Sequence, residues 1–295
     1  MAESGADASA EDATPRSAIG AASARPLGAR LAERSGTFAF RIAYFAVFAF
    51  LLAPFVVVAG TSLDASGAVV FPPSGVALRW YETLLSSPDW IRAARNSLIV
   101  AGGTTVVSTT LGVGAALGLR NVDSWPATVV TGIALVPLLV PGVVLGVSLL
   151  VFFSKLGLQQ QVPTIVAAHS LWATPLTFSV MRATFARYDW RLRDAALDLG
   201  ASRLRAFLEV VVPNVRAGLL AAACIAFVVS LQEFVMSLFL SGRETRTIPV
   251  MAWNSLRNSL DPLVSVTSTL LVVAVLLVVL AVGVTAGLER IARDT

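Results

Sequence analysis

Six long apolar stretches, separated by short polar segments, give this chain its pattern of hydrophobic and polar positions. They cover residues 42–60, 97–119, 127–154, 162–181, 217–241 and 262–288. Each is close to or above the roughly 20 residues that an α-helix needs to cross a bilayer. Because lipid offers no partner to backbone N–H and C=O groups, such stretches must be helical, and the alternation of a transmembrane barrel is absent. The pattern predicts an all-α, polytopic membrane protein with six transmembrane helices, the span in 127–154 being shorter than the stretch itself.

The composition agrees with a lipid environment. Of 295 residues, 56% are hydrophobic and 14% are charged, whereas a soluble domain carries roughly 25% charged residues. The six stretches contain one charged residue, Glu233. The single cysteine, Cys224, lies inside an apolar stretch, so a disulfide scaffold is excluded. The same composition disfavours nucleic-acid binding and disorder of the chain as a whole.

The distribution of basic residues predicts the orientation. With both termini inside, the cytoplasmic segments hold 14 arginines, and the outer loops hold 7 arginines and lysines; this favours cytoplasmic termini. Residues 1–37 are expected to be a disordered tail, residues 38–290 the transmembrane domain, and residues 291–295 a second tail. In the outer loop 61–96, Trp80 and Tyr81 indicate a short helix at the membrane interface.

The most charged part of the chain is the predicted cytoplasmic loop 187–216. Apolar residues recur there at helical spacing, first at Leu192, Ala195, Ala196 and Leu199, then at Leu204, Phe207, Leu208 and Val211. Gly200 can take the left-handed conformation that stops the first helix, and Ser202 can cap the second. Pro213 is expected to end or kink that second helix. The loop is therefore predicted to be an amphipathic helical hairpin, which either lies on the inner leaflet or docks a cytoplasmic protein.

The same loop carries a family resemblance. Asp194-Ala195-Ala196 is followed after three residues by Gly200, then after nine residues by Val210, one residue and Val212-Pro213. This resembles the EAA loop of permease subunits of bacterial ABC importers: Glu-Ala-Ala, three residues, Gly, nine residues, Ile, one residue, Leu-Pro. Every spacing matches, with Asp for Glu and Val for Ile and Leu. The resemblance implies a six-helix type I permease bundle whose loop seats in a groove of the ATP-hydrolysing subunit, through Asp194, Ala195, Ala196, Gly200 and Pro213.

Other segments look similar to spermidine/putrescine-type permeases. These are Trp80-Tyr81 with Leu84 before Asn96-Ser97-Leu98, His169 with Pro175, Gln232-Glu233-Phe234 before Phe239-Leu240-Ser241-Gly242, and Thr247-Ile248-Pro249-Val250. Permeases for iron(III), sulfate, molybdate and aminoethylphosphonate share several of these segments, so those cargoes stay open beside a polyamine. The resemblance implies a bacterial inner-membrane protein. Its implied partners are an ATP-binding subunit dimer, a second permease subunit, identical or different, and a periplasmic or lipid-anchored solute-binding protein.

No sequence motif for ATP hydrolysis or metal binding is present. The single lysine, Lys155, follows no glycine run of the kind that a phosphate-binding loop requires. One histidine and one cysteine do not supply a metal cluster or a nucleophile elbow. We therefore expect no catalytic residue, no metal and no cofactor, with ATP bound by a partner subunit.

Glu233 is the acid predicted to lie at membrane depth, about 12 Å from the outer end of its helix. A charge at a helix centre costs about 2.5–3.5 kcal/mol, so it should face the bundle interior. Glu233 and His169 are candidate lining residues of a translocation path for a cationic solute. The alternatives are a hydrogen bond between helices or a role in gating for Glu233, and a polar contact between helices for His169.

Two other classes compete with the importer. A proton-coupled secondary carrier would use Glu233 and His169 as a proton relay, but carriers usually show more intramembrane titratable groups and internal repeats than this sequence does. A membrane enzyme would need a catalytic set that the sequence does not offer.

Overall fold

The computed structural model describes residues 27–67, 69–120, 125–258 and 261–294. These residues divide into two units, one ending at Pro54 and the other beginning at Phe55. The described residues are helical apart from turns, loops and an isolated bridge between Asp64 and Val76. The prediction of an all-α protein is confirmed.

The first helix, α1 (Leu27–Ser62), begins upstream of the predicted end of the tail. Residues 27–37, predicted as part of the disordered tail, are helical in this structure, and their Ala, Leu, Arg and Glu residues are strong helix formers. At the other end of the chain, α12 (Leu263–Asp294) continues through most of the predicted 291–295 tail. Residues 1–26 and Thr295, the rest of the two tails, lie outside the described residues.

The elements between α1 and α12 follow one another along the chain, with the long outer loop 63–78 before the first of them. They are α2 (Arg79–Ser86), α3 (Pro88–Gly118), α4 (Trp125–Leu135), the 3-10 turn η1 (Val136–Leu138), α5 (Gly142–Lys155), α6 (Val162–Ala186), α7 (Arg191–Asp198), α8 (Arg203–Ala206), the π turn η2 (Phe207–Val211), α9 (Val212–Gln232), α10 (Val235–Leu240) and α11 (Ile248–Asn258).

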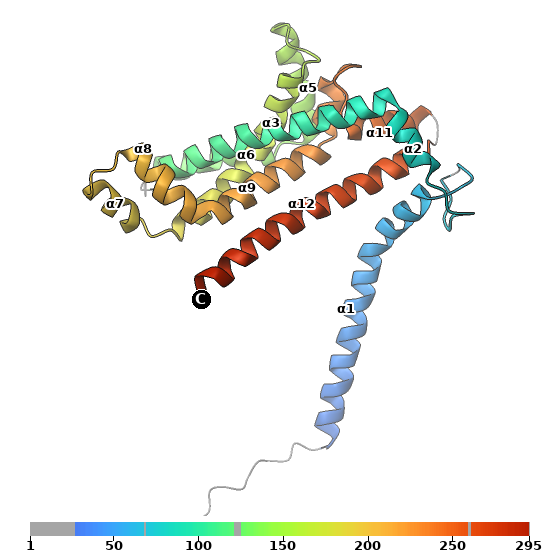
Figure 1. Cartoon of the computed structure of the whole chain (residues 1–295), viewed down its shortest axis with the longest axis horizontal. Coiled ribbons are helices and arrows are strands. Elements are labelled where there is room, and N and C mark those ends of the chain that lie inside the picture. Colours follow the sequence, from blue (N-terminus) through green and yellow to red (C-terminus); the bar gives the residue numbers. More distant parts are fainter. Residues whose placement is uncertain (1–26, 68, 121–124, 259–260, 295) are drawn as a thin grey trace, which may run out of the picture. The chain divides into compact units, whose positions relative to one another are not determined.

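Three helices, α3, α6 and α9, pack along one another to form the core of the second unit (Figure 1). Gly112 of α3 lies directly against Thr177 and Phe178 of α6. The Thr177 hydroxyl donates to the Ser108 carbonyl of α3 at 2.7 Å. Small residues let the helix backbones approach closely, and hydroxyls join them, as is typical of helix pairs inside membranes.

Four helices among the described residues are long and apolar enough to cross a membrane. They are Phe40–Ser62, Pro88–Gly118, Arg203–Gln232 and Leu263–Val284; a bent pair, Thr128–Leu138 with Gly142–Lys155, adds a fifth if it forms one span. The predicted stretch 162–181 lies inside α6, which has 25 residues but is not among these four. Helix α6 packs on both α3 and α9, and its polar side chains Thr164, His169 and Thr177 are buried in the protein.

The stretch 127–154, where the sequence predicts one span shorter than the stretch, forms two helices that are bent by 93° at a break. Pro137 and Pro141 lack the N–H that would continue the hydrogen-bond ladder, and the chain turns between them. The Trp172 indole of α6 donates to the Pro137 carbonyl at 2.8 Å. A neighbouring helix thus satisfies the carbonyl that the break leaves free, which is how membrane proteins tolerate such breaks.

The stretch 217–241 is also broken, and the prediction of a continuous helix was wrong. Helix α9 ends at Gln232, Glu233 is extended with φ −67° and ψ 123°, and α10 begins at Val235. Glu233 therefore lies in the break rather than inside a helix. No proline or glycine marks this break in the sequence.

The predicted interface helix in the outer loop is α2. The loop before it is organised by Asp64, which is buried and accepts hydrogen bonds from the backbone and hydroxyl groups of Ser66 and Ser74. These bonds lower the pKa of Asp64 to about 2. The Trp80 indole donates to the Asp64 carbonyl at 2.9 Å and ties α2 to the loop.

Candidate functional site: the cytoplasmic hairpin and the break between α9 and α10

The loop 187–216, called the hairpin below, contains the two predicted short helices. Helix α7 ends before Gly200, whose φ of +90° is in the left-handed region. Ser202 caps α8, its hydroxyl accepting from the Arg205 amide at 3.3 Å. Both predictions of local structure are confirmed, because glycine and serine have these conformational preferences in almost any context.

Pro213 does not end the second helix. The chain stays helical from Arg203 to Gln232, and the π turn η2 lies just before the proline. Proline lacks an N–H and its ring clashes with the carbonyl four residues earlier, here that of Glu209. A π turn shifts the hydrogen-bond register at that point, so the helix passes the proline without stopping.

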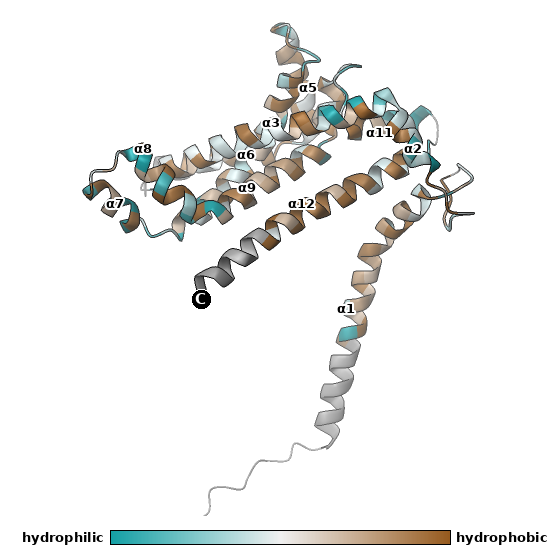
Figure 2. Ribbon diagram, in the orientation of Figure 1, coloured by the Kyte–Doolittle hydropathy of each residue, from teal (hydrophilic) through white to brown (hydrophobic). Residues whose placement is uncertain are grey.

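The hairpin turns apolar side chains outward. Leu199 is 90% exposed, and the other exposed members of the predicted stripes are Leu192, Ala195, Leu204 and Leu208. Hydrophilic and hydrophobic residues alternate along α7 and α8 (Figure 2), and the exposed residues there include Arg191, Asp194, Arg203 and Arg205. Phe207 and Val211 point the other way and pack on the core of the second unit. The hairpin is thus anchored by one face and unpartnered on the other within the described chain.

The EAA-like motif begins in α7, at the start of this hairpin. Asp194 and Ala195 are exposed, and Ala196 is half-buried. The Asp194 carboxylate lies 3.4 Å from the guanidinium of Arg193. Gly200 is exposed and has no atom within 4 Å of the position that a Cβ would take. Pro213 is exposed in the first turn of α9. Four of the five predicted residues, all except the half-buried Ala196, are therefore exposed on the hairpin.

His169 and Glu233, the other predicted pair, are brought together in the interior. The His169 Nε2 lies 3.2 Å from a Glu233 carboxylate oxygen, and both side chains are at most 3% exposed. His169 also forms hydrogen bonds with two hydroxyls, through Nδ1 with Ser230 at 2.8 Å and through Nε2 with Ser237 at 2.8 Å. One ring on α6 thus bridges the end of α9 and the start of α10.

The Glu233 carboxylate also holds the break from within. Its two oxygens accept from the backbone amides of Met236 at 2.9 Å and Ser237 at 3.1 Å, at the start of α10. These amides have no partner inside α10, because the first amides of any helix lack one. The carboxylate therefore supplies both the cap of α10 and the contact with His169. In this structure it is an interhelical hydrogen-bonding group.

Ser230 and Ser237 belong to this cluster, and sequence reasoning missed them. Their signal was present, since residues 230, 233 and 237 are spaced three and four apart and so fall on one helix face. Ser, Glu and Ser at that spacing inside an apolar stretch indicate a shared polar partner.

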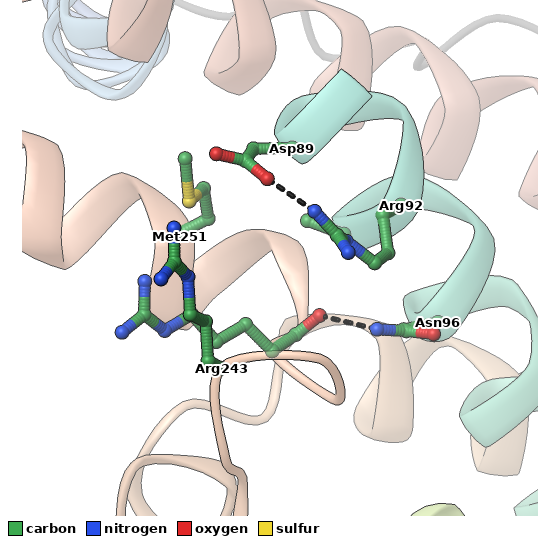
Figure 3. Close-up of a pocket in the computed structure, with 7 residues that line it drawn as sticks. Asp89, Arg92, Asn96, Arg243 and Met251 are labelled. Carbon is green, nitrogen blue, oxygen red and sulfur yellow. Dashed lines mark hydrogen bonds and ion pairs between the residues drawn. The ribbon is translucent and has the colours of Figure 1, made fainter. Parts of the chain in front are cut away.

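At the opposite end of the second unit from α7, a small hollow lies between α3 and the segment before α11 (Figure 3). Its lining includes Asp89, Arg92, Asn96, Arg243 and Met251. Arg92 pairs with Asp89 and with Glu244, and the Asn96 amide donates to the carbonyls of Glu244 and Arg246. The hollow measures about 20 Å³, which is room for little more than one water molecule. It is too small to receive a solute.

No group of three or more His, Cys, Asp or Glu side chains that could hold a metal ion is found in the part of the chain that the structure describes.

Comparison with known proteins gives one family. The family described as "binding-protein-dependent transport system inner membrane component" matches residues 108–293. The spermidine/putrescine transport system permease protein PotC of Escherichia coli is 26% identical over 249 residues, 84% of this chain and 92% of that protein. The putrescine permease PotI of Escherichia coli is 29% identical over 77% of this chain and 83% of that protein. A probable molybdenum ABC transporter permease of Haloferax volcanii is 31% identical over 74% and 83%.

Solved structures share the fold. One chain of a bacterial ABC transporter that imports the acidic polysaccharide alginate aligns with a TM-score of 0.68 at 17% identity, covering 88% of this chain and 98% of that one. A chain of the methionine ABC transporter in an inward-facing conformation aligns with a TM-score of 0.55 at 16% identity, covering 66% and 94%.

Proposed function

Because the chain belongs to the family of binding-protein-dependent transport system inner membrane components and is therefore a permease subunit of an ABC importer, we propose that it moves a polyamine into the cytoplasm. As a multi-pass inner-membrane subunit it is a transporter component and not an enzyme. Family membership selects the importer over the proton-coupled carrier and the membrane enzyme. The partners are of the kind that such importers use, a solute-binding protein and an ATPase.

The polyamine assignment is supported by two relatives, PotC and PotI, whose names state spermidine or putrescine transport. The relative from Haloferax volcanii, named for molybdenum, supports an oxyanion instead. Polyamines are cations and molybdate is an anion, so a single uptake experiment separates them. Iron(III), sulfate and aminoethylphosphonate remain further candidates from the sequence resemblance.

That experiment uses the assembled importer in proteoliposomes, with its binding protein and ATP. We expect uptake of radiolabelled putrescine or spermidine, and no uptake of molybdate. Uptake of molybdate but not of polyamine would overturn the cargo assignment, while leaving the importer class intact.

We further propose that the hairpin seats in a groove of the ATPase subunit. In this scheme ATP is bound by the ATPase subunit, and this chain binds no cofactor. The observation that supports this docking is the exposed apolar stripe of the hairpin, in which Leu199 is the most exposed residue. The hairpin also bears charged residues. An apolar group ringed by charge suits a protein groove. The termini and the hairpin would then both face the cytoplasm, as the distribution of arginines predicts. A second permease subunit would complete the translocation pathway. The break between α9 and α10, which Glu233 and His169 hold, would then lie beside that pathway.

Two substitutions test the docking role. Gly200→Val forces a β-branched residue into a left-handed conformation, at a cost of about 1–3 kcal/mol, and Ala196→Asp adds a charge to the half-buried motif position. Both should reduce co-purification of the ATPase by about ten-fold or more, while membrane insertion is unchanged.

Gly157 offers a matched control for the first variant. It also has a positive φ, +69°, and open space around the Cβ position, but it follows α5 outside the hairpin. Gly157→Val should leave ATPase co-purification at the wild-type level. Wild-type co-purification by the Gly200→Val and Ala196→Asp variants would refute the docking assignment.

A further inference from the structure

Trp190 joins the start of the hairpin to the end of α6. It is the residue before α7, and its carbonyl accepts from the Asp194 amide in the first turn of that helix. Its indole Nε1 donates to the Phe185 carbonyl of α6 at 3.1 Å. The rings of Phe185 and Tyr188 pack against it, with centroids 5.6 Å and 4.8 Å away. The indole is therefore held by α6 while its backbone belongs to α7.

The residue that follows a third helix, α3, also contacts the Trp190 ring. Arg120 follows α3, and its guanidinium carbon lies 3.5 Å from the centroid of the Trp190 ring. A cation over the face of a tryptophan is attracted by the negative face of the ring. Burial, followed by the nearby charge of Arg193, lowers the pKa of Arg120, whereas Asp194 acts in the opposite direction. Arg120 is thus close enough to Arg193 and Asp194, at the start of the hairpin, for their charges to act on its guanidinium.

The hairpin has further attachments. Helix α7 packs on η2 and α8, and these continue directly into α9. The covalent chain leads back into α6. The end of α3 is reached in two ways, since Phe207 and Val211 share a hydrophobic cluster with Ala116 of α3, and the Trp190 ring contacts Arg120 after α3. Helix α3 in turn packs on both α6 and α9. A movement of α7 that turned the indole would therefore act on the end of α3 through Arg120.

We propose that the contact between Arg120 and Trp190 transmits movement of the hairpin to α3, which makes Arg120 a positioning residue for transport. The inference rests on the proposed docking of the hairpin to the ATPase. A guanidinium on a ring face suits this role because the attraction has no single hydrogen-bond geometry, so the contact persists while the ring tilts. Arg120 acts through Trp190 and has no contact with nucleotide or solute in this scheme.

The test measures solute transported per ATP hydrolysed by the assembled importer in proteoliposomes. Arg120→Leu should leave ATPase co-purification and ATP hydrolysis near the wild-type level and lower transport per ATP by about five-fold. Arg120→Lys, which keeps a cation near the ring, should retain more of the ratio than Arg120→Leu. In a Trp190→Leu background, Arg120→Leu should have no further effect, because the contact is already lost.

Arg182→Leu is the matched control. It removes an arginine of α6 whose guanidinium donates to Thr131 on α4, and it should leave the ratio unchanged. An unchanged ratio in Arg120→Leu, an equal fall in Arg182→Leu, or additive effects of the Arg120 and Trp190 variants would overturn the proposal. Loss of ATPase co-purification in Arg120→Leu would also overturn it, since Arg120 would then shape the docking surface. Failure of the docking proposal is distinguished beforehand, because the Gly200→Val and Ala196→Asp variants would then co-purify with the ATPase at the wild-type level.

Discussion

Leu199 on the hairpin is 90% exposed, whereas the carboxylate of Glu233, in the break between α9 and α10, is 3% exposed. An apolar side chain is thus exposed on the surface and an ionisable one is buried in the interior, in a protein whose membrane spans are mostly apolar. The buried group has partners in this chain: His169 and the first amides of α10. The exposed Leu199 is followed by the turn at Gly200 and has charged neighbours, but its apolar surface is available for contact with another molecule.

The comparison distinguishes two roles for a residue whose polarity does not match its surroundings. A buried polar group without partners costs free energy, so the chain must satisfy it during folding. An exposed apolar group costs little on its own, and becomes informative when several gather on one element with charges around them. The break is therefore expected to control stability, and the hairpin to control assembly.

The largest effect on stability is expected at the break. Glu233→Leu removes the acceptor for the Met236 and Ser237 amides and for His169 Nε2, all buried, and should lower the free energy of unfolding by about 3 kcal/mol or more. Thermal unfolding of the detergent-solubilised protein, followed by tryptophan fluorescence, measures this. Gln232→Leu, at the exposed neighbouring position, should have little effect. A Glu233→Leu variant as stable as wild type would show that the break is not held by its carboxylate.

The next effect concerns helix packing in the core. A Cβ at Gly112 would lie 2.7 Å from the backbone nitrogen of Phe178 and against the hydroxyl of Thr177. Gly112→Ala should therefore destabilise the protein by about 1–3 kcal/mol through overpacking. Gly114 lies on the same helix with open space around its Cβ position, so Gly114→Ala should be neutral or stabilising. Equal melting temperatures for the two variants would mean that α3 and α6 do not pack this closely.

The smallest effect is expected for a charge pair on the hairpin. The Arg205 guanidinium lies 3.0 Å from a Glu209 carboxylate oxygen, with both side chains more than half exposed. Arg205→Ala should change the free energy of unfolding by about 0.3–0.5 kcal/mol, since exposed pairs are screened by water. The same unfolding measurement checks it. A loss above about 1 kcal/mol would place this pair with the buried cluster rather than with the exposed surface.

Local features of the hairpin could be predicted well from the sequence. Gly200 and Ser202 act through their own backbone and side-chain preferences, so their roles depend on few neighbours. Pro213 was harder, because its effect depends on whether the preceding turn can shift register, and η2 provides that shift. The cluster at the break was predicted only as a pair of candidate residues, since His169 lies 61 residues from Ser230 and 68 from Ser237.

By itself, the sequence determined that this chain is a helical membrane protein and where its exposed hairpin turns, because hydropathy and residue preference act locally. Only the tertiary structure decided that two of the six stretches are broken and which polar side chains meet in the interior. The reason is that a break in a membrane helix persists only where other groups satisfy the backbone groups that it frees. The distant Trp172 does this for the Pro137 carbonyl, and Glu233, itself paired with the distant His169, does it for the first amides of α10. The meeting of Arg120 with Trp190 is likewise a product of packing, from residues 70 positions apart.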